Sequence, residues 1–170
     1  MTGYAALLRA VNVGGTGKLP ITELKRMGVE AGFEAVSTYI ASGNLIFRSA
    51  DDEATVRAKV ERAIESYAGK PVAVHVRSAA DLAALLARNP FPDRARNRVV
   101  AILVDGPIPA DAIEQAKGRK DEEIGLGERE IFVHYGEGMA DSRLAIPAAA
   151  QGTARNINTL TKLAELTAAL

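Results

Sequence analysis

The sequence contains no cysteine and no tryptophan, two histidines, and few aromatic residues (5%). Without cysteine it has no disulfide, no thiolate nucleophile, no iron–sulfur cluster and no zinc site built on sulfur. A stacking platform for single-stranded nucleic acid needs more aromatic side chains than these. Excess charge of either sign is also absent, since 21 basic residues balance 21 acidic ones. This balance argues against a constitutive nucleic-acid coat and a polybasic membrane binder, both of which need surplus positive charge.

Long hydrophobic runs are missing as well. No stretch approaches the roughly 20 apolar residues of a transmembrane helix, and the N-terminus lacks the basic region and cleavage site of a signal peptide. We therefore expect a cytoplasmic protein without a membrane partner. Its 170 residues suit one domain or two small ones. The oligomeric state is not fixed by the sequence.

The zero net charge conceals an uneven distribution. Residues 1–50 carry five basic and three acidic side chains, and residues 142–170 carry three and one. Residues 51–141 carry thirteen basic and seventeen acidic side chains. If the fold brings the two ends together, they form a mildly cationic surface that attracts anions; the alternative is a chance partition.

Hydrophobic periodicity in the first half predicts the order strand, helix, strand, strand, helix, strand. The expected strands are Tyr4–Arg9, Ala35–Ala41, Leu45–Arg48 and Val72–Arg77, and the expected helices run from Pro20 to Gly32 and from Asp51 to Gly69. This order is that of the split βαβ, or ferredoxin-like, arrangement.

The second half repeats this order without a residue-level repeat that we detect. A capping box from Ser78 to Asp81 begins a helix through Leu86, which the turn Asn89–Pro92 stops. The elements expected beyond it are a strand at Val99–Val104, a short helix near Ala110–Lys117, a hairpin of Glu122–Leu126 with Ile131–Tyr135, and an amphipathic helix at Asn156–Leu170.

These elements predict an α+β fold, in which a ferredoxin-like split βαβ N-terminal half is followed by a second small α/β half of similar element order. The expected subdomains are residues 1–78 and 79–170, with the C-terminal helix packing back near the N-terminal motif loop.

That loop, Asn12–Lys18, is glycine-rich and lies between a predicted strand and a predicted helix, where backbone N–H groups can surround a phosphate. A Walker A motif needs glycine at position 12 and a hydroxyl residue at position 19, and the chain has Asn12 and Leu19. The loop is therefore a poor match to a nucleotide-hydrolysing P-loop. A looser anion cradle and a simple surface loop both fit it.

A second polar motif opens the C-terminal helix. The segment Thr153–Asn156 supplies capping groups and the guanidinium of Arg155, which can form a fork to a phosphate or carboxylate. Thr159 and Lys162 continue the polar face at helical spacing. The alternative is that Thr153 or Asn156 only caps the helix and that Arg155 and Lys162 are solvated.

The sequence offers no recognisable catalytic or metal site. His75 and His134 lie in predicted strands without a second ligand at metal-binding spacing. Ser42 lacks the glycine pattern of a nucleophile elbow, and its simplest role is hairpin geometry. We therefore expect no metal and no cofactor, and we assign no catalytic residue.

Three segments resemble the bacterial family catalogued as domain of unknown function 1697. They are Ala6–Gly15 with Lys18, Pro20 and Glu23–Leu24; Tyr39–Phe47; and Thr153–Thr159 with Lys162–Leu163, and Asn89–Pro92 also fits. The resemblance covers essentially the whole chain. It implies a small cytoplasmic α+β protein of ferredoxin-like topology with no established activity.

The resemblance also selects candidate ligand-binding residues, because the family's motifs carry polar groups or glycine at matching positions. With Lys162 added, the set is Arg9, Asn12, Gly14, Gly15, Lys18, Ser42, Asn44, Arg155, Asn156, Asn158, Thr159 and Lys162. The chain departs from the family at Ile157, usually Trp, and at Ala154, usually Thr. The segment Leu144–Gly152 is shorter than its family equivalent and carries Pro147.

Our leading hypothesis is a binding site for an anionic small molecule, phosphorylated or carboxylate, in a polar and weakly basic cleft. The site would form where the loop Asn12–Lys18, the turn Ser42–Asn44 and the segment Thr153–Lys162 converge. The alternative is a nucleic-acid or protein-interaction module without catalytic activity, with nucleic acid the less favoured partner. An enzyme whose acid or base the sequence does not reveal is the third possibility.

Overall fold

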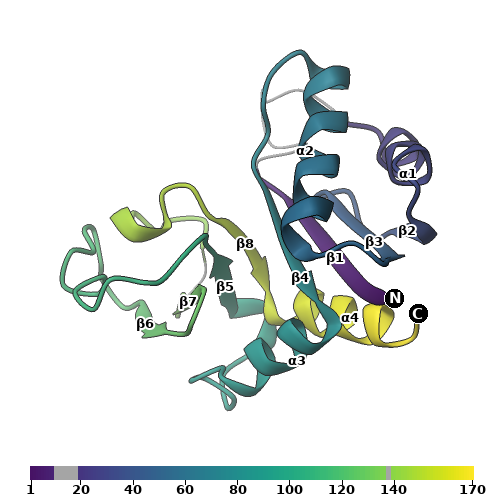
Figure 1. The fold of residues 1–170 in the computed structure, drawn as a ribbon. Helices are drawn as coiled ribbons and strands as arrows, with labels where there is room; N and C mark the ends of the chain where they lie inside the picture. Colours follow the sequence, from purple (N-terminus) through teal and green to yellow (C-terminus); the bar gives the residue numbers. More distant parts are fainter. Residues whose placement is uncertain (10–18, 137–138) are drawn as a thin grey trace. The chain divides into compact units, whose positions relative to one another are not determined.

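The computed structural model describes residues 1–9, 19–136 and 139–170 (Figure 1). Within it the chain divides into two compact units. Unit 1 comprises Met1–Ala83 and Lys162–Leu170, and unit 2 comprises Ala84–Thr161. None of the helices in these described ranges is long and apolar enough to cross a membrane.

Unit 1 contains a four-stranded antiparallel sheet with the strand order β2-β3-β1-β4. The elements are β1 (Thr2–Leu8), α1 (Ile21–Glu30), β2 (Glu34–Thr38), β3 (Asn44–Ser49), α2 (Glu53–Ala68) and β4 (Val74–Ser78). This order and pairing are those of the ferredoxin-like arrangement, so the prediction for the N-terminal half is confirmed.

Local sequence signals set the helix boundaries in unit 1. Pro20 stands directly before α1, where its fixed φ is already suited to helix entry. The carboxylate of Asp52 accepts a hydrogen bond from the Thr55 amide at 2.8 Å and so caps α2. The last turn of α2 is followed by Gly69 at φ +74°, a conformation that glycine adopts without steric cost.

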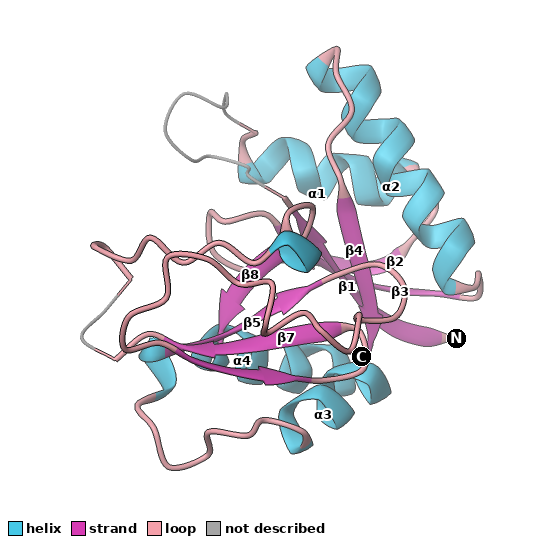
Figure 2. Cartoon of the chain, turned by 90° about the vertical axis from the view of Figure 1, so that its left-hand side faces the viewer, coloured by secondary structure: helices cyan, strands magenta, loops and turns pink. Residues whose placement is uncertain are grey.

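Helices α1 and α2 cover one face of this sheet (Figure 2). Tyr4, Ala6 and Leu8 alternate along β1 on that face and pack with apolar side chains from both helices. Phe33 and Phe47 stack within this core with their ring centroids 4.0 Å apart. The burial of these apolar side chains supplies the main driving force for folding of the unit.

Unit 2 contains the second four-stranded antiparallel sheet, with the order β6-β7-β5-β8. The elements of the second half are α3 (Ala79–Ala87), η1 (Arg96–Arg98), β5 (Val99–Leu103), β6 (Glu123–Leu126), β7 (Glu130–His134), η2 (Pro147–Ala149), β8 (Thr153–Asn156) and α4 (Ile157–Ala168). The two sheets share one topology, which confirms the prediction of two halves of similar element order.

Two details of the second half differ from the sequence prediction. The expected short helix near Ala110–Lys117 is wrong, because this segment forms successive turns, one of them closed by the Ala112 amide on the Pro109 carbonyl. The segment is short because Pro107 and Pro109 precede it and Gly118 follows it. A helix of so few residues gains too few hydrogen bonds to offset the free-energy cost of nucleation.

The second difference is β8, which the sequence predicted only as the entry to a helix. This four-residue strand is held by pairing with β5, in which Ala101 lies opposite Arg155. Arginine and asparagine give no strong strand signal, so the strand depends on its tertiary partner rather than on local propensity.

The registers reveal a residue-level correspondence that the sequence did not show. Ala5 lies opposite Arg77 in the first sheet, and Ala101 lies opposite Arg155 in the second. Extending this match along the strands aligns residues 4–7 of β1 with residues 100–103 of β5. It also aligns Asn44, which lies opposite Leu7, with Glu130, which lies opposite Leu103. The two halves therefore place specific side chains, and not only elements, at equivalent points.

We predict that replacing Gly118 by Ala destabilises the protein by more than twice as much as replacing Gly69 by Ala. Both glycines have positive φ, so each substitution costs about 1 kcal/mol for the left-handed conformation. A Cβ at Gly69 meets open space, whereas a Cβ at Gly118 overlaps the Arg143 carbonyl. Urea denaturation of both variants measures the difference, and equal losses would show that this close approach is unimportant.

Candidate functional site

Two buried arginines occupy equivalent positions in the two halves. Arg77 is the last-but-one residue of β4, and Arg155 is the last-but-one residue of β8. Their residues are only 2% and 8% exposed, respectively. Arginine is rarely buried to this extent, so both positions mark places where the protein holds a charge away from water.

The two guanidinium groups also make the same local contact. The Nη1 of Arg77 donates to the carbonyl of Val76 at 2.9 Å, and the Nη1 of Arg155 donates to the carbonyl of Ala154 at 2.9 Å. Arg155 donates in addition to the Thr153 hydroxyl, also at 2.9 Å. Burial lowers the pKa of Arg155 to about 10. The group therefore stays charged at neutral pH, at a desolvation cost that a nearby anion would offset.

A helix follows each arginine, and the two helices are capped in the same way. The Asp81 amide donates to the Ser78 hydroxyl at 3.1 Å, and the Thr159 amide donates to the Asn156 side-chain oxygen at 2.9 Å. In each helix the donor lies three residues after the capping residue. The cap predicted at Asn156 and the capping box predicted at Ser78 are therefore both present.

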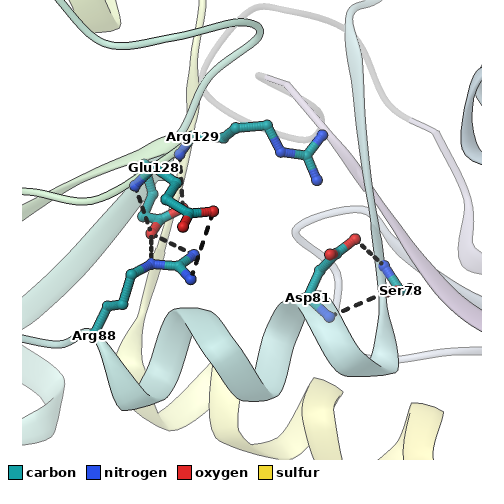
Figure 3. Close-up of polar contacts among 6 residues, drawn as sticks. Ser78, Asp81, Arg88, Glu128 and Arg129 are labelled. Atoms are coloured by element: carbon teal, nitrogen blue, oxygen red, sulfur yellow. Dashed lines mark hydrogen bonds and ion pairs between the residues drawn. The ribbon is translucent and has the colours of Figure 1, made fainter.

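The helix starts differ in charge. The Asp81 carboxylate accepts a hydrogen bond from the Ser78 amide at 3.1 Å, so α3 begins with an anion of its own (Figure 3). The equivalent residue of α4 is the neutral Thr159, and the first turn of α4 contains no acidic residue. Because a helix N-terminus favours negative charge, α4 lacks a stabilising group that α3 supplies for itself.

Of the predicted residues, Ser42 lies in the turn between β2 and β3, and Asn44 is the first residue of β3. The buried Asn44 side chain donates to the Tyr39 carbonyl at 2.9 Å and to the Ser42 hydroxyl at 3.0 Å, so it holds the turn together. Arg9 follows β1, and the amide before it, on Leu8, donates to the Gly43 carbonyl at 2.9 Å. The structure therefore brings Arg9 close to this turn within unit 1.

The remaining predicted residues divide into two groups. Asn158 is exposed and Thr159 half-buried on the first turn of α4, and Lys162 follows on the next turn, 3.8 Å from Glu165. Four predicted residues, Asn12, Gly14, Gly15 and Lys18, lie outside the described part of the chain.

A buried carboxylate that the sequence did not single out belongs to Glu130, the first residue of β7. Glu130 is 1% exposed, and its Oε1 accepts from Arg88 Nε and Nη2, both at 2.8 Å. The amides of Glu128 and Arg129 also donate to this carboxylate, at 3.3 and 3.1 Å (Figure 3). The turn before β7 is thus organised around an internal anion. No sequence signal identified it, because Arg88 is 42 residues away.

Glu130 corresponds in register to Asn44, and the two side chains have the same structural role. Each is a buried polar group at the first position of its strand, and each binds backbone groups of the turn that precedes it. The Ser42–Asn44 motif is therefore explained by turn structure, as the simplest sequence interpretation of Ser42 suggested.

The two histidines lie in separate strands, His75 in β4 and His134 in β7. His134 Nδ1 lies 3.1 Å from Glu123 Oε1, and the same oxygen is 2.9 Å from Arg94 Nη2. Cross-strand pairing brings His134 and Glu123 together, which sequence spacing could not show. Across the described ranges no three His, Cys, Asp or Glu side chains gather in a group suited to a metal ion.

Comparison with known proteins places the chain in a family. Residues 1–132 match the family described as "Protein of unknown function (DUF1697)", and the chain belongs to this family. The chain is similar to a solved structure described as conserved bacterial protein SP0830 from Streptococcus pneumoniae. The two share 28% identity and a TM-score of 0.80 over 98% of each chain. No curated protein matches the chain.

We predict that Glu130→Gln lowers the free energy of unfolding by about 1.5–3 kcal/mol, because the buried carboxylate accepts hydrogen bonds from Arg88 and from two backbone amides. Glu128→Gln is the matched control, since Glu128 is exposed and only 3.9 Å from the same arginine, and it should cost less than about 0.5 kcal/mol. Urea midpoints at an unchanged m-value give both numbers. Similar losses in the two variants would contradict the role assigned to Glu130.

Proposed function

We propose that the protein binds an anionic small molecule, phosphorylated or carboxylate, at the start of α4. The observation that carries this proposal is the contrast between two equivalent helix starts. Each follows a buried arginine, but only the start of α3 contains a carboxylate of its own, that of Asp81. An external anion beside Arg155 and Thr159 would supply the charge that α4 lacks.

The chemistry of the α4 start suits such a ligand. The guanidinium of Arg155 is planar and can form two parallel hydrogen bonds to a phosphate or carboxylate. The amide groups in the first turn of α4 add partial positive charge. Asn158 is exposed and Thr159 is partly so, and both offer neutral donors that favour an anion without requiring a second full charge.

Other predicted residues have secondary places in the proposal. Lys162 lies one turn along α4 and adds positive charge on the same helix. The loop residues Asn12, Gly14, Gly15 and Lys18 lie outside the described residues, so their binding role stays a prediction from the sequence motif. Asn44 is not proposed as a ligand contact, because its amide group already holds the turn before β3.

We predict that anions raise the melting temperature of the parent protein and that Arg155→Gln removes this response. The probes are inorganic phosphate, nucleoside monophosphates, sugar phosphates and dicarboxylates. A ligand at about 100 times its Kd adds about 2.7 kcal/mol to the free energy of unfolding, which is a shift of several degrees. Arg77→Gln is the matched control, since it removes the equivalent buried arginine and should leave the response intact.

Two outcomes of this screen would contradict the proposal. One is the absence of any response in the parent to all of these anions. The other is a response that Arg155→Gln and Arg77→Gln reduce equally, because a general loss of stability would then explain it.

A second variant tests the contrast between the helix starts directly. Thr159→Asp gives α4 the carboxylate that Asp81 gives α3. We predict that it raises the melting temperature by about 1–3 °C, because an acid in the first turn stabilises a helix, and that it also weakens the response to phosphate. Stabilisation combined with lost binding cannot result from misfolding. A variant that binds phosphate as well as the parent does would contradict the proposal.

The alternative, an interaction module without catalytic activity, predicts a different result. Binding to heparin or to a mixed RNA pool through a cationic surface weakens steeply with salt, because counterions are released on binding. Such binding without any response to small anions would favour the alternative.

A further inference from the structure

The two sheets differ in what covers their equivalent faces. In unit 1 the face with Tyr4 and Ala6 lies under α1 and α2, and both residues are buried. In unit 2 the described residues between β5 and β6 and between β7 and β8 form turns and loops, apart from the short η2 (Figure 2). Ile102, the equivalent of Ala6, is only half-buried, and Ala154, the equivalent of Val76, is exposed.

This thinner cover leaves a pocket of about 300 Å³. Its walls are mostly apolar and come largely from Ile102 of β5 and from the segment before β8, including Leu144, Ile146, Pro147 and Ala149. A pocket of this size lies at the lower end of the range for small-molecule sites. The volume and the lining suit one or two fused rings better than an extended chain.

Tyr135 is the main polar feature of the pocket. Its hydroxyl makes no hydrogen bond with any of the described residues, although its backbone amide donates to the Arg98 carbonyl at 2.9 Å. Burial, and then the negative charge of Glu122, raise the pKa of Tyr135 above its ordinary value. The hydroxyl therefore remains a hydrogen-bond donor at neutral pH and can be satisfied by an acceptor on a ligand.

Glu122 lies outside the pocket lining, but its negative charge acts on Tyr135. It is buried, and its carboxylate accepts from the Ser142 hydroxyl at 2.5 Å and from the Lys120 amide at 2.6 Å. These hydrogen bonds, that of Ser142 first, lower the pKa of Glu122, so it is ionised at neutral pH. A ligand carboxylate beside Tyr135 would be repelled by this fixed negative charge.

We propose that unit 2 contains a second binding site, distinct from the α4 start, for a neutral ring-bearing small molecule with a hydrogen-bond acceptor. The ring fills the apolar pocket against Ile102 and Ile146, and the acceptor binds the Tyr135 hydroxyl. This site does not depend on the anion site, because the pocket lining contains neither Arg155 nor any residue of α4.

The test uses three probes that share one ring system, namely indole-3-acetamide, indole-3-acetate and 3-ethylindole. Titrations followed by amide chemical shifts should show indole-3-acetamide perturbing Ile102, Tyr135, Ile146 and Ala149. Indole-3-acetate should bind at least about tenfold more weakly because of Glu122. 3-Ethylindole is neutral but lacks the acceptor, and it should also bind more weakly than the amide.

Two variants make the result specific to this pocket. Tyr135→Phe keeps the ring but removes the donor, and it should weaken indole-3-acetamide binding about three- to tenfold. Ala149→Leu fills the pocket and should abolish binding, while Arg155→Gln should leave it unchanged. The proposal is overturned if millimolar indole-3-acetamide leaves the backbone amides of Ile102, Tyr135, Ile146 and Ala149 unperturbed. It is also overturned if indole-3-acetamide and indole-3-acetate bind equally, or if the folded Tyr135→Phe and Ala149→Leu proteins bind like the parent.

Discussion

A guanidinium buried where an edge strand passes into a helix is the constraint that links the two halves of this protein. Burying a charge is costly unless polar groups surround it, and both halves meet that cost in the same way. The arginine folds back onto the carbonyl of the residue before it, and the next residue caps the helix. The strand end, the buried arginine and the helix start therefore form one local motif that occurs in both halves.

Sequence reasoning recovered the elements whose information is local. Periodicity and capping residues located α1, α2, α3 and α4, because helix signals lie within a few residues of one another. It failed where the information is tertiary. The strand β8 exists through its pairing with β5, and the contact between Arg88 and Glu130 joins residues 42 positions apart.

The candidate site residues show the same difference between local and tertiary information. Arg155 and Asn156 stood out because an arginine beside a cap is a local pattern, and the structure shows one buried and the other capping α4. Asn44 stood out for the same kind of reason, but its amide serves the turn before β3. A motif of polar residues marks positions that the fold needs as well as positions that a ligand needs, and only the contacts separate the two. The correspondence of Arg77 with Arg155 was invisible in sequence because the residues around them differ.

Because the two halves share one topology, each structural feature of one half can be compared with its equivalent in the other. Where the halves agree, as at the buried arginines and at Asn44 and Glu130, the shared feature is most simply explained by the fold. Where they differ, the difference needs a separate cause. Two differences underlie the proposed sites. Thr159 stands where Asp81 supplies a carboxylate, and the described residues of unit 2 form no α-helix at the positions that correspond to α1 and α2. The first difference is the basis of the proposed anion site, and the second accompanies an apolar pocket in unit 2. The two proposed sites favour different ligand chemistry, so neither a lone anionic group nor a lone neutral ring accounts for both. A protein that uses both sites must therefore recognise two different ligands, or one ligand whose anionic and neutral parts are well separated.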